Sequence, residues 1–258
     1  AGADLFKDRK NRSEFVLDVR NQPVRVLLLD DRPRWQTRFA LNILSRLPYV
    51  DINPIIRVSS PDGALKRGLD RGMWPDSAAA LGIYDLIVLG RFDEPVLSEK
   101  EWDQVVSFMV DGGKAVALLA PGDTRHLPEK FRRWLPVAGS KPVSGNKNAG
   151  SLSALRITPE GALHPLTRRL GEALAESPFP GGRLEPEAFA LVHEADGAWP
   201  VVSCRYAGKG RVFLLDDDRL WKNLNQHHLA AHGAMFVHLP DWSLRSFDNG
   251  VALDQNVL

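Results

Sequence analysis

The stretch VRVLLLDDRPRWQTRFALNILSRLP, residues 24–48, determines the predicted fold. It begins with a short, mostly apolar run that ends in two aspartates. Such a run is typical of a strand buried on both faces of a parallel sheet. Apolar side chains then recur near helical spacing from Arg34 to Leu47, and Pro48 ends the predicted helix. A buried strand followed by an amphipathic helix predicts a β-α unit.

The same unit recurs further along the chain. Residues 84–90 predict a central strand, and residues 115–120 predict another buried one. Between them, Ser98 and Glu101 have the spacing of a capping box, which starts a helix that runs to residue 110. Residues 51–58 predict a strand near the sheet edge, because Pro54 interrupts it. Strands that alternate with helices indicate an α/β fold, a flavodoxin-like, doubly wound and mostly parallel sheet.

The second half of the chain has a less regular pattern. Short strands are predicted at 155–158, 189–192, 201–206 and 211–215, with helices near 166–175 and 225–237. Residues 59–82, 137–151 and 177–187 are rich in turn-forming residues and predict loops.

Composition restricts the class of protein. The 258 residues are 44% hydrophobic and 25% charged, as in an ordinary globular protein, which excludes collagen, coiled coil and wholesale disorder. The formal net charge is +1, so broad electrostatic binding to nucleic acid or anionic membrane is not expected. No apolar run approaches the roughly 20 residues that span a bilayer. A single cysteine excludes an intramolecular disulfide and leaves the compartment open.

Charged residues gather where the predicted parallel strands end. Ligands of open α/β sheets bind at this edge, so we expect a ligand site there. Arginine forks suit carboxylates and tryptophan rings suit stacking, which favours a polar ligand or a peptide segment. The candidate ligand-binding residues are Asp30, Asp31, Arg34, Trp35, Arg91, Asp93, Asp218, Arg219 and Trp221. The alternatives are that the charges only neutralise one another and cap helices, and that Trp35 and Trp221 pack in the core.

Three catalytic or metal-binding alternatives receive little support from the sequence. An acidic pair at Asp30 and Asp31 is similar to that of a two-component receiver, but Gly90 stands where the phosphoacceptor aspartate belongs. His228 and His232 lie four residues apart on a predicted helix, a zinc-ligand spacing that lacks an adjacent Glu and a third ligand. Cys204 lies within a predicted strand, where a thiol more commonly packs than reacts.

Several stretches in one order resemble a known family. They are VRVLLLDDRPRWQTRF (24–39), YDLIVLGRFD (84–93), LSEKEWDQVVSFMVDGGKAVALLAP (97–121), RITPEGALHPL (156–166) and YAGKGRVFLLDDDRLWKN (206–223). Together they resemble the glutamine amidotransferase-like domains of large bacterial membrane-associated proteins. The resemblance covers residues 22–240 and implies a class I glutamine amidotransferase-like fold.

The resemblance also implies a division of the chain. Residues 1–22 would be an N-terminal extension, with residues 15–19 as the last strand of a preceding β-sandwich domain. Residues 23–240 would be the α/β domain and residues 241–258 a C-terminal tail. It further implies a periplasmic or extracytoplasmic place within a membrane-anchored protein. The expected partners are other domains of that protein or an envelope protein.

Enzymes of this family carry a catalytic cysteine at a sharp turn after a central strand, with a His and a Glu near the last strands. The equivalent turn here is Ala120-Pro121-Gly122-Asp123, which lacks a cysteine. Without a thiolate no thioester with glutamine can form. We therefore expect a non-catalytic binding or interaction module, with no catalytic residues, no cofactor and no resident metal.

An enzyme of a different kind remains the alternative. A hydrolase or amidotransferase could use a non-standard site of carboxylates, with or without a divalent metal. Its candidate residues are Asp30, Asp31, Asp217 and Asp218.

Overall fold

The computed structural model describes residues 22–56, 65–122, 124–139, 155–171, 174–179, 183–197, 199–216 and 226–244. Its strands are β1 (Val24–Asp30), β2 (Val50–Ile56), β3 (Leu86–Leu89), β4 (Ala115–Leu119), β5 (Leu155–Ile157), β6 (Ala188–Glu194), β7 (Pro200–Ala207) and β8 (Gly210–Leu215). Its helices are α1 (Trp35–Leu44), α2 (Ala78–Gly82), α3 (Glu99–Val110), α4 (Glu129–Arg132), α5 (Pro159–Leu163), α6 (Arg168–Gly171) and α7 (Gln226–Leu244). A short 3₁₀ turn spans Thr124–His126.

The described strands form one eight-stranded sheet in the order β2-β1-β3-β4-β8-β7-β6-β5. The pairs from β2 to β8 are parallel, and those from β8 to β5 are antiparallel. If β8 is counted as the fifth strand, the parallel part has the flavodoxin-like order 2-1-3-4-5. The α/β, flavodoxin-like prediction is therefore confirmed, and parallel pairing is confined to this part of the sheet.

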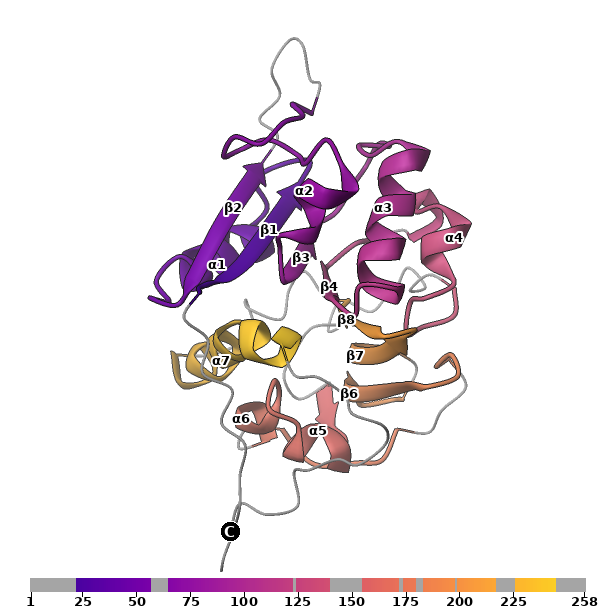
Figure 1. Cartoon of the computed structure of the whole chain (residues 1–258). Coiled ribbons are helices and arrows are strands. Elements are labelled where there is room, and N and C mark those ends of the chain that lie inside the picture. The colour runs from indigo at the N-terminus through magenta and orange to yellow at the C-terminus, as the bar shows by residue number, and fades with distance from the viewer. Residues whose placement is uncertain are drawn as a thin grey trace, which may run out of the picture.

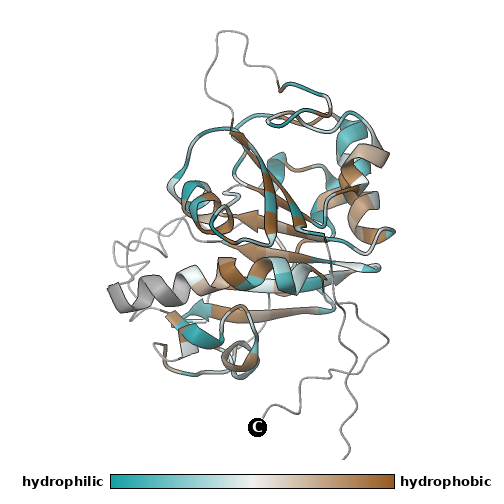
Figure 2. Cartoon of the chain, turned by 60° about the vertical axis from the view of Figure 1, so that its left-hand side comes forward, coloured by the Kyte–Doolittle hydropathy of each residue, from teal (hydrophilic) through white to brown (hydrophobic). Residues whose placement is uncertain are grey.

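Helices cover both faces of the sheet (Figure 1). On one face, Val26 and Leu28 of β1 belong to a core that includes Leu44 of α1 and Phe236 of α7. On the other face, alternate residues of β1 face Trp102 and the rest of the apolar side of α3. Two-sided burial explains why the strand sequences are nearly continuous apolar runs, which appear brown in Figure 2.

The predicted capping box begins α3. The Ser98 amide donates to Glu101 Oε2 at 2.7 Å, and the Glu101 amide donates to Ser98 Oγ at 3.4 Å. Arg67 Nε also donates to Glu101 Oε1 at 2.5 Å, which ties the loop before α2 to this helix.

The helices differ from the prediction in three of the predicted ranges. The helix expected at 166–175 is replaced by α5 and α6, because Thr158 caps a helix that starts at Pro159 and ends just before Pro165. The range 59–82, predicted as loop, contains α2, whose first turn is capped by the Ser77 hydroxyl. The last helix, α7, continues to Leu244, beyond the predicted end at 237.

Within the part of the chain that the structure describes, no helix is both long enough and apolar enough to cross a membrane. The expected strand at 15–19 lies outside the described residues.

Candidate functional site

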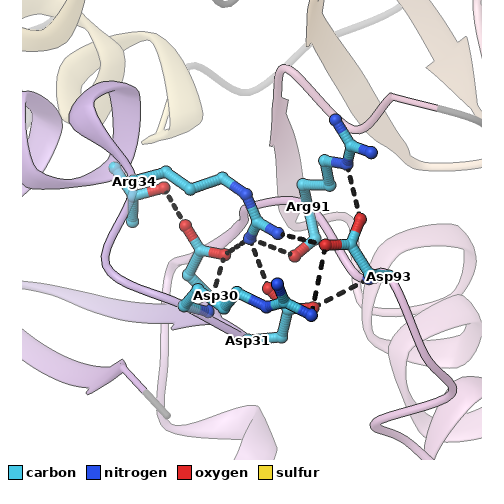
Figure 3. A network of polar contacts seen from close by, with 7 residues as sticks. Asp30, Asp31, Arg34, Arg91 and Asp93 are labelled. Carbon is cyan, nitrogen blue, oxygen red and sulfur yellow. Dashed lines mark hydrogen bonds and ion pairs between the residues drawn. The ribbon is translucent and has the colours of Figure 1, made fainter. Parts of the chain in front are cut away.

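The candidate site lies at the topological switch point of the parallel sheet. β1 pairs with β2 on one side and with β3 on the other, and β3 pairs in turn with β4. Since Leu29 of β1 lies opposite Leu89 of β3, the loops that follow these two strands start side by side. We call the polar residues that meet there the switch-point network: Asp30, Asp31, Arg32, Arg34, Thr37, Arg91 and Asp93 (Figure 3).

Arg34 is the centre of the network. Its Nη1 donates to Asp30 Oδ1 at 2.6 Å, to Asp31 Oδ1, and to the Arg91 carbonyl at 2.9 Å. Its Nη2 donates to Asp93 Oδ2 at 2.9 Å. One guanidinium therefore joins the end of β1 to the end of β3 and contacts three carboxylates, whose charge it offsets in part.

Asp30 is fully buried at the carboxyl end of β1. Burial raises the pKa of Asp30 from 3.8 to about 6, although the Thr37 hydroxyl and the Arg34 charge oppose the rise. The Thr37 hydroxyl donates to Oδ2, and the Arg32 amide approaches Oδ1 at 3.4 Å. The carboxyl is thus held in one orientation and binds a proton more readily than an exposed aspartate.

This buried carboxyl also explains Gly90. A Cβ on Gly90 would lie 2.4 Å from Asp30 Cγ, closer than any real contact between such atoms. An aspartate at position 90 has no room beside Asp30, which gives a steric reason against the receiver alternative.

Asp93 accepts hydrogen bonds from two arginines and forms an ion pair with a third. Arg91 Nε donates to Oδ1 at 2.7 Å, Arg34 Nη2 donates to Oδ2, and Arg32 Nη2 lies 3.5 Å from Oδ2. Partial burial would raise the pKa of Asp93, but the Arg91 hydrogen bond and the charges of all three arginines outweigh it and lower the pKa. The Asp93 amide donates to Asp31 Oδ2 at 2.8 Å, which fixes the second loop against the first.

The structure brings together five of the predicted site residues: Asp30, Asp31, Arg34, Arg91 and Asp93. Trp35 is 65% exposed at the start of α1, with the Arg38 guanidinium 5.7 Å from its ring centroid, so the core-packing alternative is wrong for this residue. Asp217, Asp218, Arg219 and Trp221 lie outside the described residues.

Sequence reasoning did not assign Thr37, Arg32 or Gly90 to the site. A signal for Thr37 exists, because a hydroxyl in the first turn of a helix after a buried strand can reach back to the end of that strand. Gly90 carries a similar signal, since a glycine that ends a buried strand often marks close approach of another group.

The other predicted candidates do not add to this site. Cys204 lies in β7 and is 1% exposed, and burial raises the pKa of its thiol. His228 and His232 lie on α7, in a part of the helix whose side chains the structure does not describe. Among the described residues, no group of three or more His, Cys, Asp and Glu is arranged to hold a metal ion.

The turn after β4 has an unusual backbone. Ala120 has φ 48°, in the left-handed region that residues other than glycine rarely adopt, and Gly122 has φ 70°. The Ala120 amide donates to the Leu215 carbonyl at 2.6 Å, which holds the turn against the end of β8. A left-handed residue directly after a central strand is one feature of a nucleophile elbow, in which a strand turns sharply into a helix, and at Ala120 the side chain is a methyl group.

Comparison with known proteins supports the fold. No family model and no curated protein matches the chain. The cytoplasmic protein STM1381 of Salmonella typhimurium LT2 is similar with a TM-score of 0.53 and 11% identity, over 85% of this chain and 99% of that one. The cytoplasmic protein STM3548 of Salmonella typhimurium has a TM-score of 0.50 and 12% identity, over 86% and 98% of the two chains. Identities this low define a shared α/β fold and nothing about activity.

The titration of Asp30 gives a testable pH dependence. The folded-state pKa of about 6 lies above the value of 3.8 for a free carboxyl, so the folded state binds the proton more tightly than the unfolded state does. The resulting stability is present below about pH 4 and is lost as pH rises through 6, a change of about 3 kcal/mol. Asp30→Asn keeps the size of the side chain and an oxygen for Arg34 but cannot titrate.

We therefore expect the unfolding free energy of the wild-type protein, minus that of Asp30→Asn, to fall across this pH range. Urea unfolding of both proteins at several pH values measures the difference. Groups outside the network, such as Glu101, are common to both proteins and cancel in it. A difference that is independent of pH would contradict the assigned titration.

Proposed function

We propose that this chain is a catalytically silent, glutamine amidotransferase-like domain that acts as a binding or interaction module, with its ligand site at the switch point of the sheet. The observation that carries the proposal is the combination of an elbow without a nucleophile and a preorganised polar network beside it. Ala120 takes the left-handed backbone after β4, whereas Arg34 joins Asp30, Asp31 and Asp93 at the neighbouring strand ends.

The chemistry of the single cysteine supports the absence of amidotransferase activity. Cys204 is the only cysteine of the chain, and it lies inside β7 rather than at a strand-to-helix turn. Its thiol is buried and its pKa is raised, so the thiolate needed to attack an amide is disfavoured. Glutamine hydrolysis through a thioester therefore has no suitable nucleophile.

The carboxylate or metal-assisted alternative receives less support. Arg34 already occupies the position between Asp30 and Asp31 that a divalent cation would take. A metal ion would have to displace a guanidinium that also holds Asp93 and the Arg91 carbonyl. The negative charges of Asp30 and Asp31 are therefore offset by an arginine of the same chain, which leaves no position between them for a cation.

The cellular setting is part of the same proposal and follows from the resemblance stated above. The domain would belong to a larger envelope-associated protein, outside the cytoplasm, with other domains of that protein or an envelope protein as partners. The near-neutral formal charge of the whole chain favours such partners over nucleic acid.

Ammonia release from glutamine tests the catalytic part of the proposal. We expect the purified protein and its Cys204→Ser variant to release no ammonia above the buffer background, because neither has an accessible thiolate. Cys204→Ser places a hydroxyl in an apolar position and should lower the unfolding free energy by about 1 to 3 kcal/mol, so its folding is checked by circular dichroism. Release by the wild type that disappears in folded Cys204→Ser would make the chain an amidotransferase and overturn the proposal.

A further inference from the structure

The charged side chains of the switch-point network form two layers, buried carboxylates inside and exposed guanidinium groups outside. Asp30 and Asp31 form the inner layer, with side chains 0% and 6% exposed. Arg91 and Arg32 form the outer layer, with side chains 46% and 59% exposed. Since Asp93 lies between the layers, a ligand that approaches this edge of the sheet meets guanidinium groups first.

Arg91 uses only one side of its guanidinium within the described residues. Its Nε donates to Asp93 Oδ1, and no dashed line reaches either of its Nη atoms in Figure 3. Among the described residues neither Nη has a hydrogen-bond partner. The unused pair of Nη groups is the part of an arginine that binds a carboxylate through two parallel hydrogen bonds.

The turn after β4 supports Arg91 in this position. A Cβ on Gly122 would lie 3.0 Å from Arg91 Nε and 3.2 Å from its Cζ, so the absence of a side chain allows the guanidinium to lie against the backbone. Gly122 also has φ 70°, which favours glycine. Asp93 on one side and Gly122 on the other thus position the group without using its Nη atoms.

The charge of the network indicates which anion fits. Three arginines, Arg32, Arg34 and Arg91, face three aspartates, so the network is neutral when every carboxyl is ionised and carries one positive charge when Asp30 is protonated. A single negative charge matches this balance better than a phosphate dianion does. Trp35, exposed one residue after Arg34, adds an aromatic surface beside the same loop.

We propose that the outer layer of this network binds the carboxylate group of a ligand, with the two Nη groups of Arg91 as its donors and Arg32 as a supporting charge. The inference rests on the proposed function as a binding module and names the chemistry of its ligand. The carboxylate could belong to a small molecule or to the end of a peptide, and the test separates the two.

Titration with N-acetylglycine, followed by nuclear magnetic resonance of the labelled protein at low ionic strength, tests the inference. We expect saturable shifts of the Arg91 Nε–H and of backbone amides in the loops after β1 and β3, with a Kd in the millimolar range for one exposed bidentate contact. N-acetylglycinamide, which has the same shape without the charge, should produce no saturable shift.

Matched variants locate the site. Arg91→Gln should weaken N-acetylglycine binding by about tenfold or more, and Arg91→Lys should restore part of it, because lysine keeps the charge without the fork. Arg46→Gln removes an exposed arginine just beyond the C-terminal end of α1 and should leave the Kd unchanged. Arg91 is half-exposed, so Arg91→Gln should fold, which its amide spectrum will verify.

The outcomes are distinct. If N-acetyl-Gly-Trp-Gly binds more tightly than acetate, the carboxylate belongs to the end of a peptide. If the two bind with equal affinity, it belongs to a small molecule. Binding of the neutral amide, an unchanged Kd in Arg91→Gln, or tighter binding of inorganic phosphate would overturn the inference. None of these results bears on glutamine hydrolysis, so the catalytic part of the proposed function is tested separately.

Discussion

Replacing Arg34 by alanine is expected to lower the unfolding free energy by about 3 to 5 kcal/mol at neutral pH. Arg34 is the guanidinium that contacts Asp30, Asp31 and Asp93, and the first two of these carboxylates are buried. Without it, these carboxylates repel one another away from water. Urea unfolding at neutral pH measures the loss, which should shrink at pH 5 because Asp30 then binds a proton.

Arg32→Ala is the matched control for Arg34→Ala. It removes the same group from the same loop, but the side chain of Arg32 is 59% exposed and lies 3.5 Å from Asp93. An exposed pair of this kind contributes less than about 1 kcal/mol. Equal losses of unfolding free energy in the two variants would mean that the overall charge balance, rather than the specific contacts of Arg34, stabilises the network.

That the charged residues after β1 and β3 lie close together could be predicted, because it follows from the order and direction of the strands. Apolar runs at residues 24–29 and 84–90 identified two strands, and parallel strands place their carboxyl ends at one edge. Asp30 and Asp93, sixty-odd positions apart in the chain, could therefore be assigned to one site from strand order alone. Asp218, Arg219 and Trp221 were assigned in the same way, and their placement stays a prediction.

Helical spacing predicted most of the face of α1 that packs on the sheet, but it left the place of Trp35 open. Phe39 and Leu44 pack against the core as the spacing predicts, whereas Trp35 is exposed. Thr37 is buried on the same helix and donates a hydrogen bond to Asp30. A periodicity argument does not include polar contacts of this kind between a helix and the end of a strand.

The antiparallel part of the sheet was also not predictable from pattern. Most residues of β6 and β7 are buried, as in the parallel strands, so burial does not distinguish the two kinds of pairing. Strand direction depends on connection length. β7 and β8 are joined by a turn at Gly208 and Lys209, which requires an antiparallel pair.

Gly90→Ala is expected to lower the unfolding free energy by about 3 kcal/mol or more, through overpacking at a site that cannot relax. The added Cβ would lie 2.4 Å from Asp30 Cγ and within 2.8 Å of both carboxyl oxygens. Asp30 cannot move aside easily, because it is fully buried and bonded to Thr37 and Arg34. Gly82→Ala, at an exposed helix end where a Cβ meets nothing within 4 Å, is the control and should cost nothing.

A double variant shows whether the clash with Asp30 is the cause. Asp30→Ala removes the carboxyl that the new methyl group would strike, so adding Gly90→Ala to it should cost less than about 1 kcal/mol. Urea unfolding of the two single variants and the double variant gives this coupling. Additive losses would mean that Gly90 is required by its backbone rather than by the carboxyl beside it. Strong coupling would establish that one buried carboxyl fixes both the glycine at the end of β3 and the arginine that joins the two strands.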